Sequence, residues 1–206
     1  MADSVLRRIV SRLRPAPIST RAALESFLEE RALLIAQKCA IDYCRGKTGL
    51  ASYALFTEKP FLDALEVCRW EAFAAVLGDL LILAETALRP HVEPAERERL
   101  CAALVALHAR ILTSKPAPGH RAEGWHDVAA SFALALQAAS TGAPREALDV
   151  ADHSARRLFE TLPIHSTYRE LDQEVVYGAV RFRMIAVNQE MRSRIAPADL
   201  ARALLA

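Results

Sequence analysis

The sequence contains little glycine, and no segment of useful length alternates between apolar and polar residues. Glycine accounts for 7 of the 206 residues, while 52% of the residues are hydrophobic, with alanine and leucine the commonest among them. Alanine and leucine favour helix and glycine does not, so this composition indicates α-helix. A half-buried β-strand would show a period of two, which is absent. We therefore expect an all-α protein.

The chain also lacks an excess of either charge. Its 26 lysine and arginine residues nearly balance its 25 aspartate and glutamate residues, which gives a formal net charge of +1. A protein that binds nucleic acid strongly usually carries a basic surplus or a basic stripe, so we expect no nucleic-acid partner. A hydrophobic share of 52% with 25% charged residues is typical of a globular chain rather than a disordered one.

Long apolar runs are missing as well. The longest extends from Ala72 to Ala84, and Asp79 interrupts it. A membrane-spanning helix needs about 20 apolar residues, so this run predicts a core helix instead. The basic N-terminus is not followed by the apolar segment of a signal peptide. We expect a cytoplasmic protein.

Cysteine and histidine do not occur at the spacings of a metal site. Cys39 and Cys44 are separated by four residues, and no histidine or second cysteine pair follows at a zinc-ligand spacing. Glu123 and His126 have the Glu-x-x-His spacing of di-iron bundles, but such a site needs this motif twice. His108 lies on an apolar helix face and is interpreted as a satisfied core residue. We predict no metal and no cofactor, and free cysteine thiols in a reducing compartment.

Residues 1–17 form a segment of their own. Within residues 1–14, four arginines fill the gaps between apolar residues at helical spacing, which are Val5, Leu6, Ile9, Val10 and Leu13. The prolines at 15 and 17 interrupt this pattern. One interpretation is a basic amphipathic arm that binds an anionic membrane surface, which would place the protein at the inner face of a membrane. The other is an arm that docks on its own domain or on a partner.

Residues 18–206 are predicted to form a single helical-bundle domain. Apolar residues recur every three or four positions in segments separated by glycine and proline. These segments cover about residues 19–45, 60–88, 95–113, 125–140, 144–162, 167–195 and 197–206. Short connections make neighbouring helices antiparallel, so we expect an antiparallel bundle of seven or eight helices. Residues 114–124 form the longest stretch of helix-breaking residues, and a boundary between two lobes stays open there.

The predicted helix over residues 167–195 carries a clear apolar stripe. Its members are Tyr168, Leu171, Val175, Ala179, Phe182 and Ile185. Each apolar stripe of a bundle must be buried against another helix, so we expect this one to face the core.

The stretch YCRGKTGL at residues 43–50 contains a Gly-Lys-Thr, but it does not match a nucleotide-binding loop. A phosphate loop has a glycine five residues before the Gly-Lys pair, where this chain has Ile41, and it follows a strand. We expect Gly46 to end a helix and Gly49 to turn the chain.

Three groups of polar and aromatic residues are candidates for binding a ligand or a partner. They are Tyr43, Arg45 and Lys47; Glu66, Arg69 and Trp70; and Tyr177 and Arg181. The first group could bind an anion at a helix end. In the second, Glu66 and Arg69 can pair at i, i+3, and Trp70 can pack over the guanidinium. Buried charges must be paired, so these residues and Asp79 form either structural ion pairs and solvated faces, or a polar pocket or partner surface.

No catalytic set stands out in the sequence. The Gly-x-Ser-x-Gly motif of serine hydrolases is absent, and we predict no catalytic residue. We therefore favour a non-enzymatic interaction or regulatory protein. It would use one helix face, that of residues 167–195, to bind a protein partner or to form a homodimer. The alternative is a small apolar-ligand or lipid-binding bundle, or a cofactor-dependent bundle enzyme, with a pocket between helices.

Overall fold

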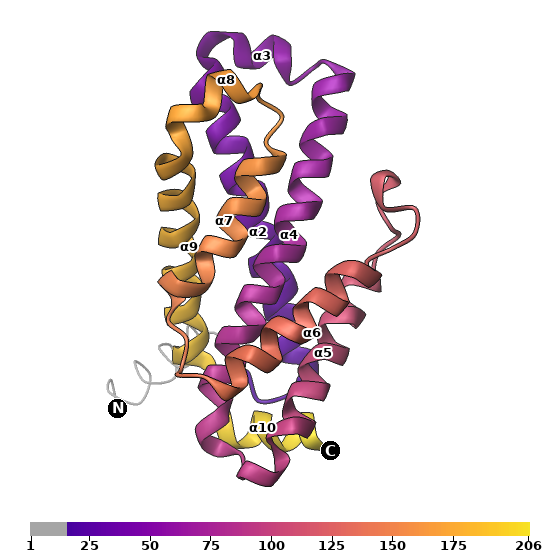
Figure 1. Ribbon diagram of the computed structural model, residues 1–206, viewed down its shortest axis with the longest axis vertical. Helices are drawn as coiled ribbons and strands as arrows, with labels where there is room; N and C mark the ends of the chain where they lie inside the picture. The colour runs from indigo at the N-terminus through magenta and orange to yellow at the C-terminus, as the bar shows by residue number, and fades with distance from the viewer. Residues whose placement is uncertain (1–15) are drawn as a thin grey trace, which may run out of the picture.

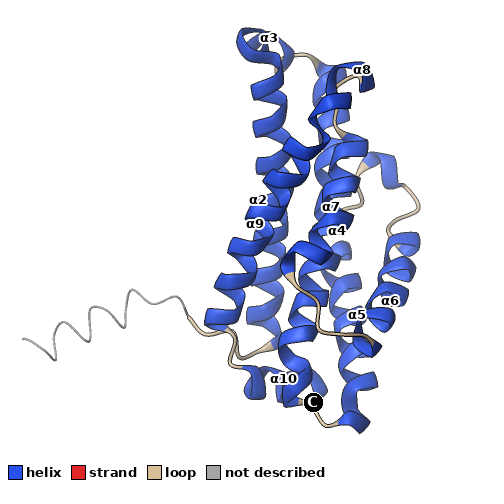
Figure 2. Cartoon of the chain, turned by 60° about the vertical axis from the view of Figure 1, so that its left-hand side comes forward, coloured by secondary structure: helices blue, strands red, loops and turns tan. Residues whose placement is uncertain are grey.

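The computed structural model describes residues 16–206, and within them the fold is all-α, as the composition predicts (Figure 1, Figure 2). The predicted arm lies outside the described residues, apart from its end at residues 16 and 17. The helices are α2 (Arg21–Thr48), α3 (Ser52–Leu55), α4 (Lys59–Leu88), α5 (Arg97–Thr113), α6 (His126–Thr141), α7 (Ala147–Thr161), α8 (Ser166–Arg169), α9 (Gln173–Arg194) and α10 (Pro197–Leu205). Short 3₁₀ turns include η4 (Gly119–Arg121) and η5 (Glu170–Asp172). The described residues contain no strand, only an isolated bridge between Ile18 and Ile195.

Four long helices form an up-down-up-down bundle, which confirms the predicted antiparallel arrangement. The chain rises through α2, descends through α4, rises through α7 and descends through α9 (Figure 1). In space, α4 packs most extensively against α2 and α7, and α7 packs against α9. Between α4 and α7 the chain inserts the hairpin of α5 and α6, which lies on the side of α4 away from α9 (Figure 1). The short α10 closes the lower end against α4 and α5.

Helix α4 is the centre of the molecule. Every residue from Glu71 to Thr86 is buried, on all faces of the helix. A helix that is apolar all round must be surrounded by other elements, and α4 contacts α2, α5, α6, α7, α9 and α10. The prediction that the apolar run at residues 72–84 forms a core helix is therefore confirmed. Among the described residues, no helix combines the length and the hydropathy needed to cross a bilayer.

Helix α2 ends later than the sequence predicts. It continues through Gly46 to Thr48, and the chain turns at Gly49, which has a φ of +53°. A glycine inside a helix costs only about 1 kcal/mol, so Gly46 does not stop it. Gly49 ends the helix because its positive φ, with a ψ of −126°, turns the chain out of the helix, while its N–H still donates to the carbonyl of Arg45.

The predicted orientation of the apolar stripe near the C-terminus is wrong. The structure divides residues 166–194 into α8, η5 and α9. Four large residues of the predicted stripe point to solvent, with Tyr168 70%, Leu171 96%, Val175 64% and Phe182 70% exposed. The buried face of α9 consists instead of Val176, Tyr177, Val180, Met184, Val187, Asn188 and Met191. This second stripe extends along most of α9 and packs into the core.

Because α9 buries Met184 and exposes Phe182, shortening these two side chains should have unequal effects on stability. Met184→Ala is expected to lower the free energy of unfolding by about 3 kcal/mol, because it leaves a cavity in the core. Phe182→Ala in dilute solution is expected to change it by less than about 0.5 kcal/mol, because the side chain is exposed. Urea denaturation followed by circular dichroism measures both, and equal losses would contradict the observed orientation.

Candidate functional site

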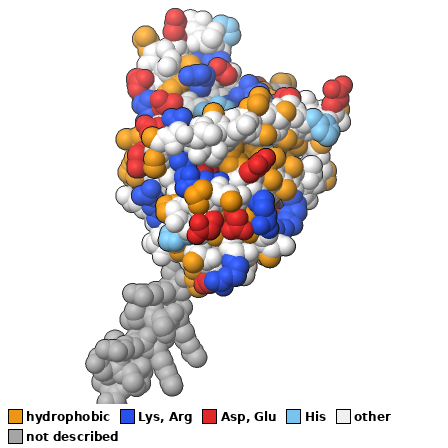
Figure 3. All heavy atoms as spheres, turned by 60° about the horizontal axis from the view of Figure 1, so that its bottom comes forward, with side chains coloured by type: hydrophobic (Ala, Val, Ile, Leu, Met, Phe, Trp, Pro, Cys, Tyr) orange, Lys and Arg blue, Asp and Glu red, His pale blue; other side chains and the backbone are white. Residues whose placement is uncertain are grey.

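A cleft of about 550 Å³ opens between α4, α6 and α7. Helix α6 crosses α4 obliquely and diverges from α7 (Figure 1). Side chains of all three helices line the cleft. Its walls are mainly apolar, and charged side chains from α4, α7 and the segment before α6 line the rest. On the face shown in Figure 3, acidic and basic side chains are interspersed rather than segregated by sign.

Small residues create the open space. Ala74, Ala75 and Gly78 line the cleft from α4, and Ala135 and Ala138 line it from α6. Gly78 also permits the close approach of the two helices. A Cβ atom there would lie 3.2 Å from Cδ2 of Phe132, so a larger residue would push the Phe132 ring of α6 away from α4.

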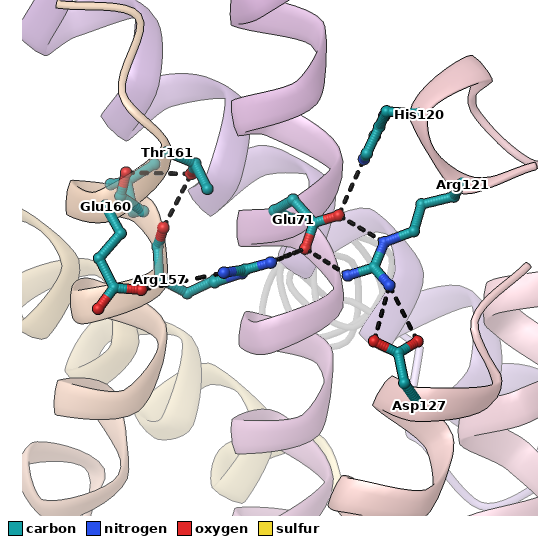
Figure 4. Close-up of polar contacts among 8 residues, drawn as sticks. Glu71, His120, Arg121, Asp127, Arg157, Glu160 and Thr161 are labelled. Carbon is teal, nitrogen blue, oxygen red and sulfur yellow. Dashed lines mark hydrogen bonds and ion pairs between the residues drawn. The ribbon is translucent and has the colours of Figure 1, made fainter. Parts of the chain in front are cut away.

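Glu71 is the centre of a network of charges at one end of the cleft (Figure 4). It is 4% exposed, and its Oε1 accepts hydrogen bonds from Arg121 Nε at 2.7 Å and from His120 Nε2 at 2.8 Å. Its Oε2 accepts from Arg121 Nη2 at 2.8 Å and from Arg157 Nε at 3.1 Å. Arg121 also binds both carboxylate oxygens of Asp127, at 2.9 and 2.8 Å. The network joins α4 to α7 and to the segment before α6.

The network keeps the buried carboxylate of Glu71 ionised. Burial alone would raise the pKa of Glu71, but the hydrogen bonds from Arg121, Arg157 and His120 outweigh it and lower the pKa to about 2. The same contacts raise the pKa of Arg121. The charges of this wall therefore compensate one another within the protein.

A second buried carboxylate, Asp79, orients a histidine at the cleft. Asp79 Oδ1 lies 2.9 Å from Nδ1 of His153, and its Oδ2 accepts the backbone N–H of Ser154 at 3.1 Å. With Nδ1 bound to the carboxylate, Nε2 of His153 is the ring nitrogen left for a ligand. Burial raises the pKa of Asp79, and the hydrogen bond to Asp79 raises the pKa of His153. The pair can thus hold a proton at the rim of the cleft.

His108 lines the cleft from α5, and its hydrogen bonds are not satisfied within the protein. The ring is fully buried and stacks on Phe132, with centroids 4.2 Å apart at 28°. Among residues 16–206, neither ring nitrogen has a hydrogen-bond partner. Burial lowers the pKa of His108 to about 4. The carbonyl of Ala74 is close enough to raise this pKa slightly, but it accepts no hydrogen bond from the ring. The neutral ring therefore offers one donor and one acceptor.

The first group of candidate residues predicted from the sequence lies away from the cleft, at the upper end of α2. The Tyr43 hydroxyl donates to Oδ2 of Asp172 at 2.9 Å, and Lys47 Nζ binds the same oxygen at 2.5 Å. The Arg45 guanidinium lies 5.4 Å from the centroid of the Phe56 ring. The structure thus brings Tyr43 and Lys47 together on a carboxylate of the chain itself.

The second group lies between α2 and α4. Glu66, Arg69 and Trp70 line a smaller cavity of about 180 Å³. Arg69 Nη2 donates to the side-chain oxygen of Gln37 at 3.0 Å, and no ion pair joins it to Glu66 among the described residues. Trp70 packs edge-on against Phe73 instead, with ring centroids 5.7 Å apart.

The third group lies between α7 and α9. The Arg181 guanidinium packs 5.4 Å from the centroid of the Tyr177 ring. Its Nε donates to Asp152 of α7 at 2.7 Å, and its Nη1 donates to Glu174 at 3.3 Å. None of the three groups lines the α4–α6–α7 cleft.

Sequence reasoning missed most of the cleft. It singled out Asp79 but not Glu71 or Glu85, although all three are acidic residues in a mainly apolar segment. That pattern was the available signal, because a buried carboxylate requires a partner. The partners Arg121 and Arg157 lie 50 and 86 residues from Glu71 in the sequence, so no local motif connects them.

Comparison with protein-family models, with curated proteins and with solved structures finds no match to this chain. In the described part of the chain, no three histidine, cysteine, aspartate or glutamate side chains are grouped so that they could hold a metal ion. The functional argument therefore rests on the residues of the cleft and of the surface.

The low pKa of Glu71 predicts a loss of stability in acid. Its ionised form stabilises the fold above pH 4.5, and this contribution is lost as the pH falls from 4.5 toward about 2. Glu71→Gln is expected to lower the free energy of unfolding at neutral pH by about 2 kcal/mol, because the neutral amide loses the charge-assisted hydrogen bonds from Arg121 and Arg157. It should also flatten the pH dependence between these values. Urea denaturation at a series of pH values measures both effects, and an unchanged acid profile would contradict the role of Glu71.

The Asp79–His153 pair predicts a change in the titration of one histidine. Asp79→Asn is expected to lower the pKa of His153, because the neutral amide cannot stabilise the imidazolium. Titration of the imidazole resonances by NMR measures this pKa. His165 is exposed and has no carboxylate partner among the described residues, so it serves as the internal control. A pKa of His153 that does not move would show that the hydrogen bond to Asp79 is not its cause.

Proposed function

We propose that this protein binds a small, mainly apolar molecule in the α4–α6–α7 cleft. The single observation that carries the proposal is the mainly apolar cleft itself, at whose rim Asp79 binds Nδ1 of the exposed His153 and leaves Nε2 for a ligand. A ligand with a hydroxyl or carbonyl group can form a hydrogen bond with this nitrogen.

The dimensions and lining of the cleft support this class of ligand. Its volume of about 550 Å³ lies within the range of about 300–1,000 Å³ found for small-molecule sites. Alanine side chains from α4 and α6 supply apolar walls against which a hydrocarbon body can pack. Burial of that body supplies the affinity, and a hydrogen bond to the polar group fixes the orientation.

The charges at the cleft favour a neutral ligand. Glu71 is bound by Arg121 and Arg157, and Asp79 is bound by His153. A cationic ligand would have to break one of these pairs. An anionic ligand would find outside them only Arg145, which is exposed and forms no ion pair among the described residues, so that solvent weakens the attraction. We therefore propose a neutral amphiphile with an apolar body and one hydroxyl or carbonyl group.

A substitution that fills the cleft tests the proposal. Ala135 lines the cleft from α6 with its side chain exposed, so Ala135→Phe adds a ring to the cleft without disturbing the core. The probes are decanol and decanoate, which share a chain and differ in charge. Isothermal titration calorimetry is expected to show that decanol binds more tightly than decanoate, and that Ala135→Phe weakens decanol binding at least about tenfold, a loss of about 1.4 kcal/mol.

The matched control is Ala130→Phe, which places the same ring at an exposed position of α6 that does not line the cleft. It should bind decanol as the unaltered protein does. Native mass spectrometry of the purified protein adds a second measurement, since a resident ligand appears as mass that is lost on denaturation. Equal decanol binding by both variants would remove the cleft as the binding site.

The exposed stripe beside α9 favours a second candidate function, the binding of a protein. Tyr168, Leu171, Val175 and Phe182 are mostly exposed, and they lie along the consecutive elements α8, η5 and α9. Exposed apolar patches of this kind mark sites of protein association. This is the kind of function expected from the sequence for residues 167–195, but the sequence named Tyr177 and Arg181 as the contact residues of that segment and predicted that the stripe is buried.

A further inference from the structure

The hydrogen bond between Asp79 and His153 determines which ring nitrogen of His153 carries a proton. Nδ1 lies 2.9 Å from Oδ1 of Asp79, so the neutral imidazole has its proton on Nδ1 and donates it to the ionised carboxylate. Nε2 then has only a lone pair, and it makes no hydrogen bond within residues 16–206. A neutral His153 therefore presents a hydrogen-bond acceptor to the cleft that it lines.

One added proton reverses the hydrogen-bonding character of Nε2. If the proton binds the ring, the imidazolium has an N–H on both nitrogens. If it binds Asp79 instead, the carboxyl group donates to Nδ1, and the ring carries its own proton on Nε2. Two groups in direct contact titrate as a pair, so the position of the proton between them does not matter to the cleft. In either case the protonated pair presents a donor.

We propose that the Asp79–His153 pair selects the polar group of the ligand in the cleft. When the pair has released its proton, Nε2 can accept a hydrogen bond from a hydroxyl group, but a carbonyl group has no hydrogen to donate. When the pair holds the proton, Nε2–H donates to either group. The inference rests on the proposed function and divides its ligands into two classes. Hydroxyl compounds bind in both states, and carbonyl compounds bind tightly only in the protonated state.

Other charged and titratable side chains line the cleft or lie beside His153 on α7. They are Glu71, His108, Arg121, Asp127, Arg145, Asp149, Asp152, Arg156 and Arg157. On the neighbouring helix α9, Arg181 binds Asp152. Two arginines of α7 lower the pKa of His153, but the hydrogen bond to Asp79 outweighs them and raises it.

Three of these neighbours keep their charge state while the pair titrates. Glu71 and Asp127 have lowered pKa values and stay ionised. His108 has a pKa of about 4 and stays neutral. The proton of the Asp79–His153 pair is therefore the one that changes at the cleft as the pH passes through the pKa of His153. Since that pKa is raised, the donor is present below it and is lost as the pH rises.

Two uncharged probes of equal chain length, decanol and 2-decanone, test the selection. Isothermal titration calorimetry of the full chain is carried out on both sides of the pKa of His153, which NMR titration measures. As the pH rises through it, 2-decanone binding is expected to weaken roughly three- to tenfold, the effect of one hydrogen bond, and decanol binding to change less than about twofold. Because linkage is reciprocal, saturating 2-decanone should raise the pKa of His153, whereas decanol should not.

Asp79→Asn is expected to gain 2-decanone binding at high pH. Oδ2 of Asp79 accepts the backbone N–H of Ser154 at 3.1 Å, so the amide oxygen of the variant takes this place and its NH₂ group faces Nδ1 of His153. The amide then donates to Nδ1, and the neutral ring carries its proton on Nε2. The variant should bind 2-decanone at high pH as tightly as the unaltered protein does at low pH. Nitrogen-15 shifts of the imidazole verify the tautomer.

The matched control is Asp152→Asn. It removes a carboxylate from the adjacent residue of α7, which binds Arg181 and does not line the cleft. This variant should keep the pH dependence of 2-decanone binding. Thermal unfolding of each variant verifies the fold, and the pH series on the unaltered protein needs no variant at all.

The contrary outcomes separate the inference from the function on which it rests. If both probes bind in the unaltered protein with the same pH profile, and Ala135→Phe weakens both, the cleft function stands and the selection by the pair is wrong. A folded Asp79→Asn variant that binds 2-decanone with the pH profile of the unaltered protein also overturns the selection. If neither probe binds at any pH, or if Ala135→Phe leaves both affinities unchanged, both proposals fall.

Discussion

The arrangement of this protein depends on the burial of three carboxylates in one helix. Glu71, Asp79 and Glu85 are 4%, 2% and 1% exposed, and all three belong to the part of α4 that is surrounded on every side. An ionised carboxylate cannot be buried without partners, because the loss of hydration costs several kcal/mol. The rest of the chain must therefore bring donors to α4 at three levels, and these donors determine where the neighbouring segments lie.

Two of these carboxylates fix the two ends of α6 to α4 through arginine side chains. At one end, Glu71 binds Arg121, which in turn binds Asp127 in the first turn of α6. At the other end, Glu85 binds Arg89, which donates to the carbonyls of Ala139 and Gly142, both at 2.8 Å. Between the two ends, Phe132 packs against Gly78 of α4, while Ala135 and Ala138 line the cleft. The cleft is thus the space beside these small side chains on a helix that is fixed at both ends.

The helical fold was predictable from the sequence, but the orientation of α9 and the cleft were not. A helical period reveals apolar stripes, and α9 carries two of them, so periodicity alone cannot say whether Phe182 or Met184 faces the core. Which face of α9 is buried depends on neighbours distant in sequence, such as Asp152 of α7, which binds Arg181 of α9. The cleft was missed for the same reason, since Glu71 finds its partners only after the chain has folded.

Helix α7 lies between the two proposed sites. Its cleft-facing side carries His153 and Arg157, and its Asp152 binds Arg181 of α9. A ligand that shifted α7 would affect the second site only through the packing of α7 on α9 and this partly exposed ion pair. Coupling between two binding sites is reciprocal in free energy. A ligand in the cleft that strengthens protein binding by the exposed residues of α8, η5 and α9 must therefore itself bind more tightly to the protein complex. A ligand that leaves α7 in place has no route through this helix, and the two sites then act independently.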